Sequence, residues 1–233
     1  RAIRYARELL GSIKPNSISK FDYRIHNTLG EVFLDLQMYG QAMSHFTEAN
    51  IIRERLGKVS APWLLINIGN VYYQQQKYIK AREYYLNGLD MFNSLKHNQD
   101  NRVSGRKVAL SNLGRIEVRI KNYDKALNYF REALDVSRKS PRFHAFKKAK
   151  EKNSIVYEGN AKGVAYQHSL ISNLYLIWGQ YDLAAEENKK ADRILKYIIE
   201  KSEKNSSLKA AKKLLGNNLS LLAEINTKLG KFE

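Results

Sequence analysis

The sequence of 233 residues contains no cysteine and only three prolines. Without cysteine the chain forms neither disulfide bonds nor thiolate metal sites. The sequence is therefore compatible with both reducing and oxidising compartments, and the cytoplasm is slightly favoured over the periplasm. No apolar run approaches the ~18 residues of a membrane-spanning helix, and Arg1 begins helix-like sequence with no signal-peptide core. The scarcity of proline, together with abundant Ala, Leu, Lys and Glu, predicts an all-α fold.

Known catalytic motifs are absent as well. The sequence has no GxGxxG, phosphate-loop, HExxH or GxSxG motif. Its histidines lie far apart, and none forms a ligand pair at helical spacing. We therefore expect no enzyme activity, no catalytic or metal-binding residues and no cofactor.

The charge is strongly positive, with 40 Lys and Arg against 23 Asp and Glu and a formal net charge of +17. Such a field attracts nucleic acid, anionic membranes and acidic proteins. Neither of the two basic stretches listed below alternates cations with aromatic residues, as proteins that bind single-stranded nucleic acid do. We therefore favour the interpretation that these lysines lie on solvated faces, and polyanion binding is the alternative function. The stretches comprise Arg138, Lys139, Arg142, Lys147, Lys148, Lys150 and Lys152, and then Lys201, Lys204, Lys209, Lys212 and Lys213.

An internal repeat is the strongest signal in the sequence. Three segments that begin at Asn27, Asn67 and Asn112 align without gaps. In each, a glycine is followed nine residues later by Tyr, twelve later by Ala and sixteen later by an aromatic residue. Small residues are required where two helices cross closely, and large ones fill the gaps between them, so the spacing predicts helical hairpins. The sets are Gly30, Tyr39, Ala42 and Phe46; Gly69, Tyr78, Ala81 and Tyr85; and Gly114, Tyr123, Ala126 and Phe130.

This pattern resembles the tetratricopeptide repeat. The resemblance implies an all-α, right-handed superhelical α-solenoid of stacked helical hairpins. A fourth unit has Ser172 in the glycine position and Asn188 where an aromatic residue is expected, and a fifth begins around Ala223. His26 and His168 both lie four residues before the small residue of their units, and we expect each to pack inside its hairpin.

We expect a single solenoid over residues 1–233, cut through repeats at both ends. Its units exceed the ~34 residues of the standard repeat and look like those of bacterial regulatory and sensor proteins or of kinesin light chain-like adaptors. The expected parts are the second helix of a preceding repeat (1–20), repeats at 23–58, 62–100 and 107–140, a basic insertion at 141–161, a repeat at 162–205, and the first helix of a further repeat at 206–233.

In tetratricopeptide arrays the first helices of the hairpins line a concave groove that binds peptides. Asparagine amides there can bond to a peptide backbone, and Arg115 and Arg119 can pair with an acidic side chain. Asn70 and Asn112 match the asparagine pair of a carboxylate clamp, but Ile66 replaces one of its cations, so heat-shock-protein tails are not expected ligands. The alternative is that the asparagines join helices. The expected groove comprises Trp63, Asn67, Asn70, Tyr73, Asn112, Arg115, Arg119, Tyr166 and Asn173.

The expected function is therefore a non-catalytic scaffold that binds a protein or peptide ligand, acidic in character. The resemblance implies the interaction or sensory region of a larger bacterial regulatory protein, with effector domains outside this chain.

Overall fold

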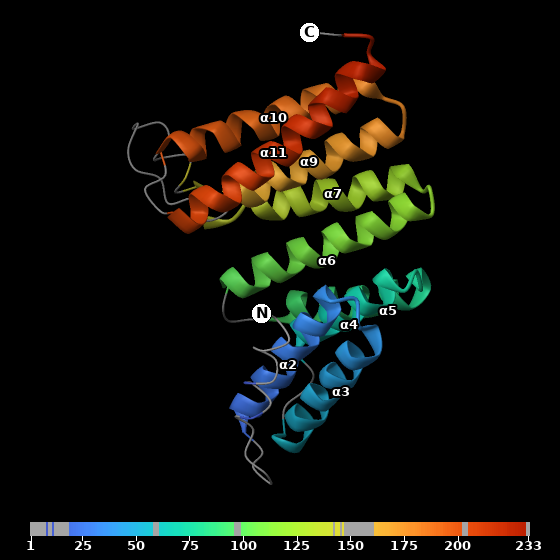
Figure 1. Cartoon of the computed structure of the whole chain (residues 1–233), viewed down its shortest axis with the longest axis vertical. Coiled ribbons are helices and arrows are strands. Elements are labelled where there is room, and N and C mark those ends of the chain that lie inside the picture. The colour runs from blue at the N-terminus through green and yellow to red at the C-terminus, as the bar shows by residue number, and fades with distance from the viewer. Residues whose placement is uncertain are drawn as a thin grey trace. The chain divides into compact units, whose positions relative to one another are not determined.

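The computed structural model describes residues 8, 11, 19–57, 61–95, 99–141, 143, 144, 146, 161–201 and 205–231. These residues form nine α-helices and no strand (Figure 1), which confirms the predicted all-α fold. None of the described helices is long and apolar enough to cross a membrane. The chain divides into two compact units, Arg1–Leu95 and Lys96–Glu233, called unit 1 and unit 2 below.

Unit 1 consists of two helical hairpins. In each hairpin the first helix packs against the second, α2 against α3 and α4 against α5, and α4 also contacts α2 and α3. The four helices are α2 (Lys20–Asp35), α3 (Tyr39–Arg55), α4 (Pro62–Gln74) and α5 (Tyr78–Ser94). The expected second helix of a preceding repeat at 1–20 lies largely outside the described residues.

Unit 2 contains two more hairpins and a further first helix. α6 packs against α7 and α9 against α10, while α9 also contacts α7, and α11 contacts both α10 and α9. The five helices are α6 (Gln99–Arg119), α7 (Tyr123–Arg138), α9 (Ala161–Ile177), α10 (Tyr181–Lys201) and α11 (Asn205–Lys228). Of the basic insertion expected at 141–161, residues 142, 145 and 147–160 lie outside the described part of the chain, whereas Phe143 and Phe146 are buried in the core of unit 2.

The starts of the first helices follow local chemistry. Ser19 caps α2, because its hydroxyl accepts hydrogen bonds from the Phe21 and Asp22 amides at 3.2 Å each. The Asp22 carboxylate accepts from the Ser19 amide at 2.8 Å in return, which completes a capping box. α4 starts with Pro62 at its first turn, where a missing N–H costs nothing.

The repeated glycine is the point where the two helices of a hairpin touch. A Cβ atom at Gly114 would lie 2.5 Å from the Phe130 ring, and one at Gly69 would lie 2.6 Å from the Tyr85 ring. Only glycine leaves room for these buried rings. The spacing of glycine and aromatic residue is therefore the packing pattern that the sequence predicted.

A second repeated feature is the turn between the helices of each hairpin. The residue seven positions after the small residue has a left-handed backbone in all five units, with φ between 59° and 81°. The next amide bonds back to the fifth residue before it, as in Asn122 N to Glu117 O at 2.8 Å. This is the Schellman arrangement, which satisfies carbonyls at a helix end. The left-handed residues are Gln37, Gln76, Lys121, Gly179 and Gly230.

The fourth unit replaces the glycine–aromatic contact with polar contacts. Ser172 donates its hydroxyl to the Ala184 carbonyl at 2.7 Å. Asn188, fully buried where the other units have a ring, forms a reciprocal amide pair with Asn218 of α11: each side-chain nitrogen donates to the other residue's backbone and side-chain oxygens, at 2.9–3.1 Å. The smaller asparagine leaves room for the serine, and its own polar groups are satisfied by the next repeat.

Candidate functional site

The nine predicted groove residues lie on three first helices. Within unit 1, α4 carries Trp63, Asn67, Asn70 and Tyr73. Within unit 2, α6 carries Asn112, Arg115 and Arg119, and α9 carries Tyr166 and Asn173. The surface that the first helices form in each unit is called its first-helix face below. That these residues bind a ligand stays a prediction.

On the first-helix face of unit 1, an amide–carboxylate network joins α2 to α4. Asn67 donates its side-chain N–H groups to Asn27 Oδ1 at 3.2 Å and to Glu31 Oε1 at 2.9 Å. Asn27 donates to the same Glu31 oxygen at 2.8 Å. No described residue donates to Asn67 Oδ1 or to Glu31 Oε2. These two oxygens are therefore held in place with the capacity to accept further hydrogen bonds.

The other predicted residues of α4 also contact their own hairpin. Asn70 Oδ1 accepts a hydrogen bond from the Tyr85 hydroxyl at 2.8 Å. This bond joins α4 to α5, as expected from the alternative interpretation that the asparagines join helices. The Trp63 ring packs edge-on against Phe92 at 5.0 Å. The Tyr73 ring lies 5.7 Å from that of Tyr78. These contacts limit the side-chain motion that a ligand would have to restrict.

In unit 2, hydrogen bonds between repeats connect three first helices. Ser111 of α6 donates to Gln167 of α9 at 3.1 Å, and Ser169 of α9 donates to Asn218 of α11 at 3.0 Å. In both pairs the serine lies three residues before its small residue, and its partner lies five before the next small residue. Sequence reasoning missed this repeated bridge, although a comparison of polar residues between successive units could have found it.

The predicted residues of unit 2 differ in exposure. Asn112 is buried, whereas Arg115, Arg119, Tyr166 and Asn173 are exposed. The four exposed side chains on α6 and α9 are therefore the accessible part of the predicted site in this unit.

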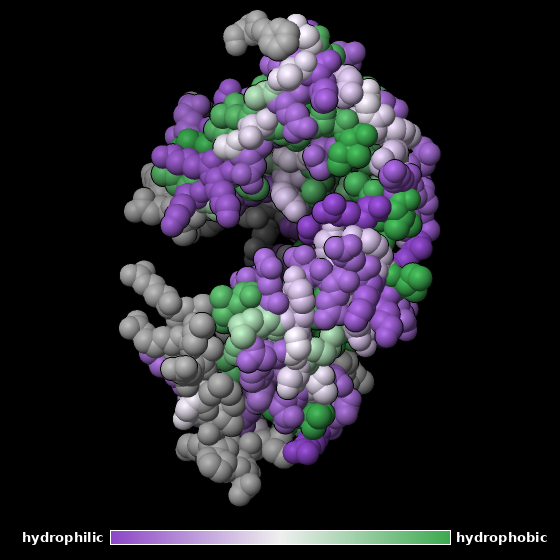
Figure 2. Space-filling model, turned by 45° about the vertical axis from the view of Figure 1, so that its right-hand side comes forward, coloured by the Kyte–Doolittle hydropathy of each residue, from purple (hydrophilic) through white to green (hydrophobic). Residues whose placement is uncertain are grey.

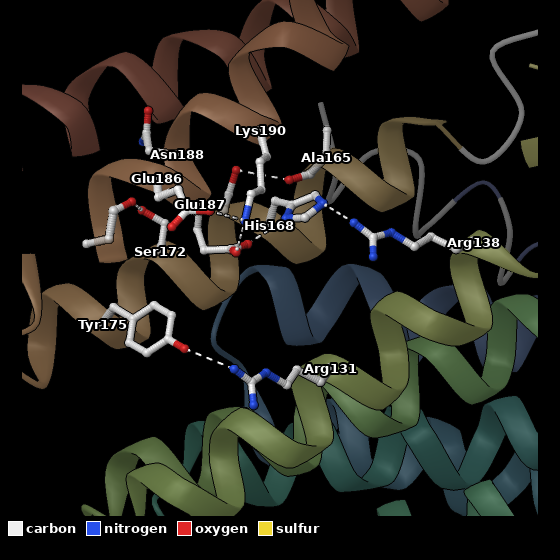
Figure 3. Close-up of polar contacts among 12 residues, drawn as sticks. Arg131, Arg138, Ala165, His168, Ser172, Tyr175, Glu186, Glu187, Asn188 and Lys190 are labelled. Atoms are coloured by element: carbon white, nitrogen blue, oxygen red, sulfur yellow. Dashed lines mark hydrogen bonds and ion pairs between the residues drawn. The ribbon is translucent and has the colours of Figure 1, made fainter. Parts of the chain in front are cut away.

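A polar cluster that the sequence did not predict lies between α7, α9 and α10 (Figure 3). The His168 imidazole, 2% exposed, contacts Glu187 Oε2 through Nδ1 at 2.6 Å and Arg138 Nη2 through Nε2 at 3.0 Å. A guanidinium can only donate, so Nε2 accepts and the protonated Nδ1 donates to the carboxylate. Burial raises the pKa of the Glu187 carboxyl, but hydrogen bonds from His168 and Lys190 outweigh it, and the net pKa is lowered.

His168 has a counterpart in unit 1. His26 of α2 contacts His45 of α3, Nδ1 to Nδ1, at 3.0 Å, and the partner lies nineteen residues on in both hairpins. Both histidines contact the second helix of their own hairpin, as predicted, but His168 also contacts Arg138 of the preceding hairpin. Among the residues that the structure describes, no group of three or more histidine and acidic side chains could hold a metal ion.

The same cluster borders a cavity of about 300 Å³. Its rim carries the exposed Arg131 and Arg138 of α7, and its floor includes the buried Leu134 and Ile171. Arg131 Nη2 donates to the Tyr175 hydroxyl at 3.2 Å, so both arginines reach from α7 to α9. The lining residues are Arg131, Leu134, Asp135, Arg138, His168, Ile171, Tyr175, Glu187 and Lys190.

The remaining surface is mainly polar on the face that Figure 2 shows, where hydrophobic residues lie in small groups between hydrophilic ones. Of the basic stretches, Lys147, Lys148, Lys150 and Lys152 lie outside the described residues, whereas Lys209, Lys212 and Lys213 are exposed on α11. Polar contacts, rather than one large apolar patch, therefore dominate what this face offers to a partner.

Helical hairpins with a small residue at each crossing define a helical repeat protein. Residues 60–139 match the family model of the tetratricopeptide repeat. This match confirms the predicted resemblance to the tetratricopeptide repeat over these residues. No curated protein matches the sequence.

Solved structures with the same fold extend the match beyond this span. The apo form of RapI is 17% identical, with a TM-score of 0.62 over 91% of this chain. BtubC (BKLC) from P. vanneervenii is 16% identical, with a TM-score of 0.62 over 99% of this chain and 86% of its own. A Rap protein complexed with Competence and Sporulation Factor is 16% identical, with a TM-score of 0.61 over 98% of this chain. The chain spans 65% of RapI and 61% of that Rap protein. Identities this low show the fold alone.

Proposed function

We propose that the chain is a non-catalytic scaffold that binds protein or peptide segments through its first-helix faces. The network of Asn27, Glu31 and Asn67 carries this proposal. Its bonds hold two acceptor oxygens, Asn67 Oδ1 and Glu31 Oε2, that no described residue occupies. An extended peptide presents a row of backbone N–H groups, which such acceptors fit without dependence on the peptide's side chains.

The first-helix face of unit 2 offers cationic hydrogen-bond donors. The exposed Arg115 and Arg119 lie four residues apart on α6 and so project from the same face of the helix. Guanidinium groups bind carboxylates through paired hydrogen bonds, which favours an acidic ligand here. The fold likeness to a Rap protein complexed with Competence and Sporulation Factor supports a regulatory role. We therefore propose a sensory or interaction region of a larger bacterial regulator.

The test uses peptides selected on the whole chain from a random twelve-residue display library. The Asn67→Ala variant should bind them about fivefold more weakly, since one hydrogen bond contributes about 1 kcal/mol. The matched control is Asn87→Ala, because Asn87 is exposed on the second helix α5 of the same unit. It should bind like the wild type.

Replacement of Arg115 and Arg119 by glutamine should weaken acidic peptides selectively. Selected peptides that bind both variants as tightly as the wild type would refute the first-helix faces as the site. Tight binding of a single-stranded oligonucleotide, lost steeply with salt, in the absence of any selected peptide would instead support the polyanion alternative.

A further inference from the structure

The cavity between α7, α9 and α10 has an uneven distribution of charge. Each acidic side chain that lines it already has a cation or donor: Asp135 Oδ2 lies 2.7 Å from Lys139 Nζ, and Glu187 accepts from Lys190 at 2.8 Å and contacts His168 at 2.6 Å. The acidic groups of the cavity are therefore neutralised by groups other than its two arginines.

Arg131 and Arg138 have only neutral partners within the described part of the chain. Arg131 donates to the Tyr175 hydroxyl at 3.2 Å and Arg138 to His168 Nε2 at 3.0 Å, each through one nitrogen. A guanidinium has five N–H donors, so each keeps donors for a ligand. Both head groups are also held in position, which lowers the entropy lost when an anion binds.

The floor of the cavity strengthens such binding. Leu134, Ile171, His168 and Tyr175 are buried beneath the two exposed arginines. The buried side chains limit the water that reaches the head groups from below, so an ion pair formed over them is screened less than one that water surrounds on all sides. The arrangement is a basic recess between α7, α9 and α10, and none of the nine predicted groove residues lines it.

We propose that this recess binds an acidic peptide segment, with one carboxylate on Arg131 and another on Arg138. The two arginines are seven residues apart on α7, which places them on one face about 10.5 Å apart along the helix. A polyproline II segment has three residues per turn and a rise of about 3.1 Å, so its residues i and i+3 lie on one side about 9 Å apart. Glutamates three residues apart in such a segment match the arginine spacing.

The experiment measures fluorescence anisotropy of a labelled Ser-Glu-Pro-Pro-Glu-Ser peptide titrated with the whole chain. The double variant Arg131→Gln with Arg138→Gln should bind at least tenfold more weakly than the wild type. The matched pair Lys189→Gln with Lys196→Gln removes the same charge from two exposed positions of α10, also seven residues apart but outside the cavity lining, and should change the affinity less than twofold. A peptide with glutamine in place of both glutamates should not bind.

Several outcomes would overturn the inference. Equal losses in the arginine pair and in the lysine pair would show a diffuse field instead of a site. Loss in Arg115→Gln with Arg119→Gln, but not in Arg131→Gln with Arg138→Gln, would assign the peptide to the proposed first-helix face. Wild-type affinity in the Arg131 and Arg138 variant, no binding by the wild type, or displacement of the peptide by an equal concentration of pyrophosphate would also refute it. Loss confined to Arg131 and Arg138 supports the recess and leaves the proposed function to the Asn67 test.

A second variant covers the case in which the glutamine variant unfolds, which circular dichroism would reveal. Arg131→Lys with Arg138→Lys keeps both charges but lacks the planar fork that binds a carboxylate through two hydrogen bonds. It should fold and bind several-fold more weakly than the wild type. Unchanged affinity in this variant would contradict the proposal.

Discussion

The same substitution, glycine to alanine, should have opposite effects at two helical positions of unit 2. At Gly114 the added Cβ would lie 2.5, 2.7 and 3.0 Å from three atoms of the Phe130 ring. Carbon atoms normally approach to about 3.5–4.0 Å, so the ring has to move by roughly 1 Å. Phe130 is 1% exposed and has no open space to move into. At Gly216, in the middle of α11, a Cβ would meet nothing within 4 Å.

The magnitudes follow from two opposing terms. Alanine is favoured over glycine in a helix by about 1 kcal/mol, and this gain applies at both positions. Overpacking a buried contact costs about 1–3 kcal/mol, and overlap with three ring atoms places Gly114 near the upper end. We therefore expect Gly114→Ala to lower the free energy of unfolding by about 2 kcal/mol and Gly216→Ala to raise it by about 1 kcal/mol.

The assay is urea unfolding of the whole chain, followed by far-ultraviolet circular dichroism. Phe130→Leu supplies an internal check, because Gly114→Ala should cost at least about 1 kcal/mol less in that background if the ring is the obstacle. Stabilisation by Gly114→Ala, or a cost that does not depend on residue 130, would show that the crossing tolerates a larger residue and would refute the explanation of the repeat.

Three further outcomes are expected. Asn188→Ala should destabilise unit 2 by about 3 kcal/mol, since it removes three hydrogen bonds of the buried pair at about 1 kcal/mol each. In contrast, Asn128→Ala on the exposed side of α7 should change stability by less than about 0.5 kcal/mol in thermal melts. Lys121→Gly should raise the free energy of unfolding by about 1 kcal/mol, because Lys121 has φ of 61°; a loss in urea titrations would contradict this. Burial lowers the pKa of His26 and His45 from 6.5, so stability that is present above about pH 6.5 should be lost as pH falls through the folded values. Melting temperatures measured against pH should show a flatter decline in His45→Gln, and an unchanged decline would exclude the pair as its cause.

The hairpin fold was predictable because its main determinant is local in sequence. Gly114 and Phe130 are sixteen residues apart, and the same spacing recurs in three units. The close crossing of the two helices is therefore visible as a pattern when the repeats are aligned. The turns were only partly predictable. Gly179 and Gly230 indicate a left-handed residue by type, but Gln37 and Lys121 adopt the same backbone without any such preference.

Contacts between repeats were not predictable in the same way. The fourth unit was recognisable as weaker because Asn188 replaces an aromatic residue, but its partner, Asn218, lies on another helix thirty residues away. Arg138 and His168 are likewise thirty residues apart and occupy no repeated position as a pair. For the predicted groove, residue type and position identified the first helices, whereas the bond from Tyr85 to Asn70 depends on side-chain geometry.

The buried amide pair of Asn188 and Asn218 restricts the order of the repeats. Hairpins whose contacts are purely apolar can in principle be exchanged, duplicated or deleted, because one hydrophobic neighbour replaces another. A hairpin that presents a phenyl ring to Asn218 would lack the three hydrogen bonds that the Asn188 side chain forms, and the mismatch would cost about 1–3 kcal/mol. The junction between α10 and α11 therefore selects its neighbour by hydrogen bonding. Shuffling of repeat units, in evolution or by design, should succeed less often at this junction than at an apolar one.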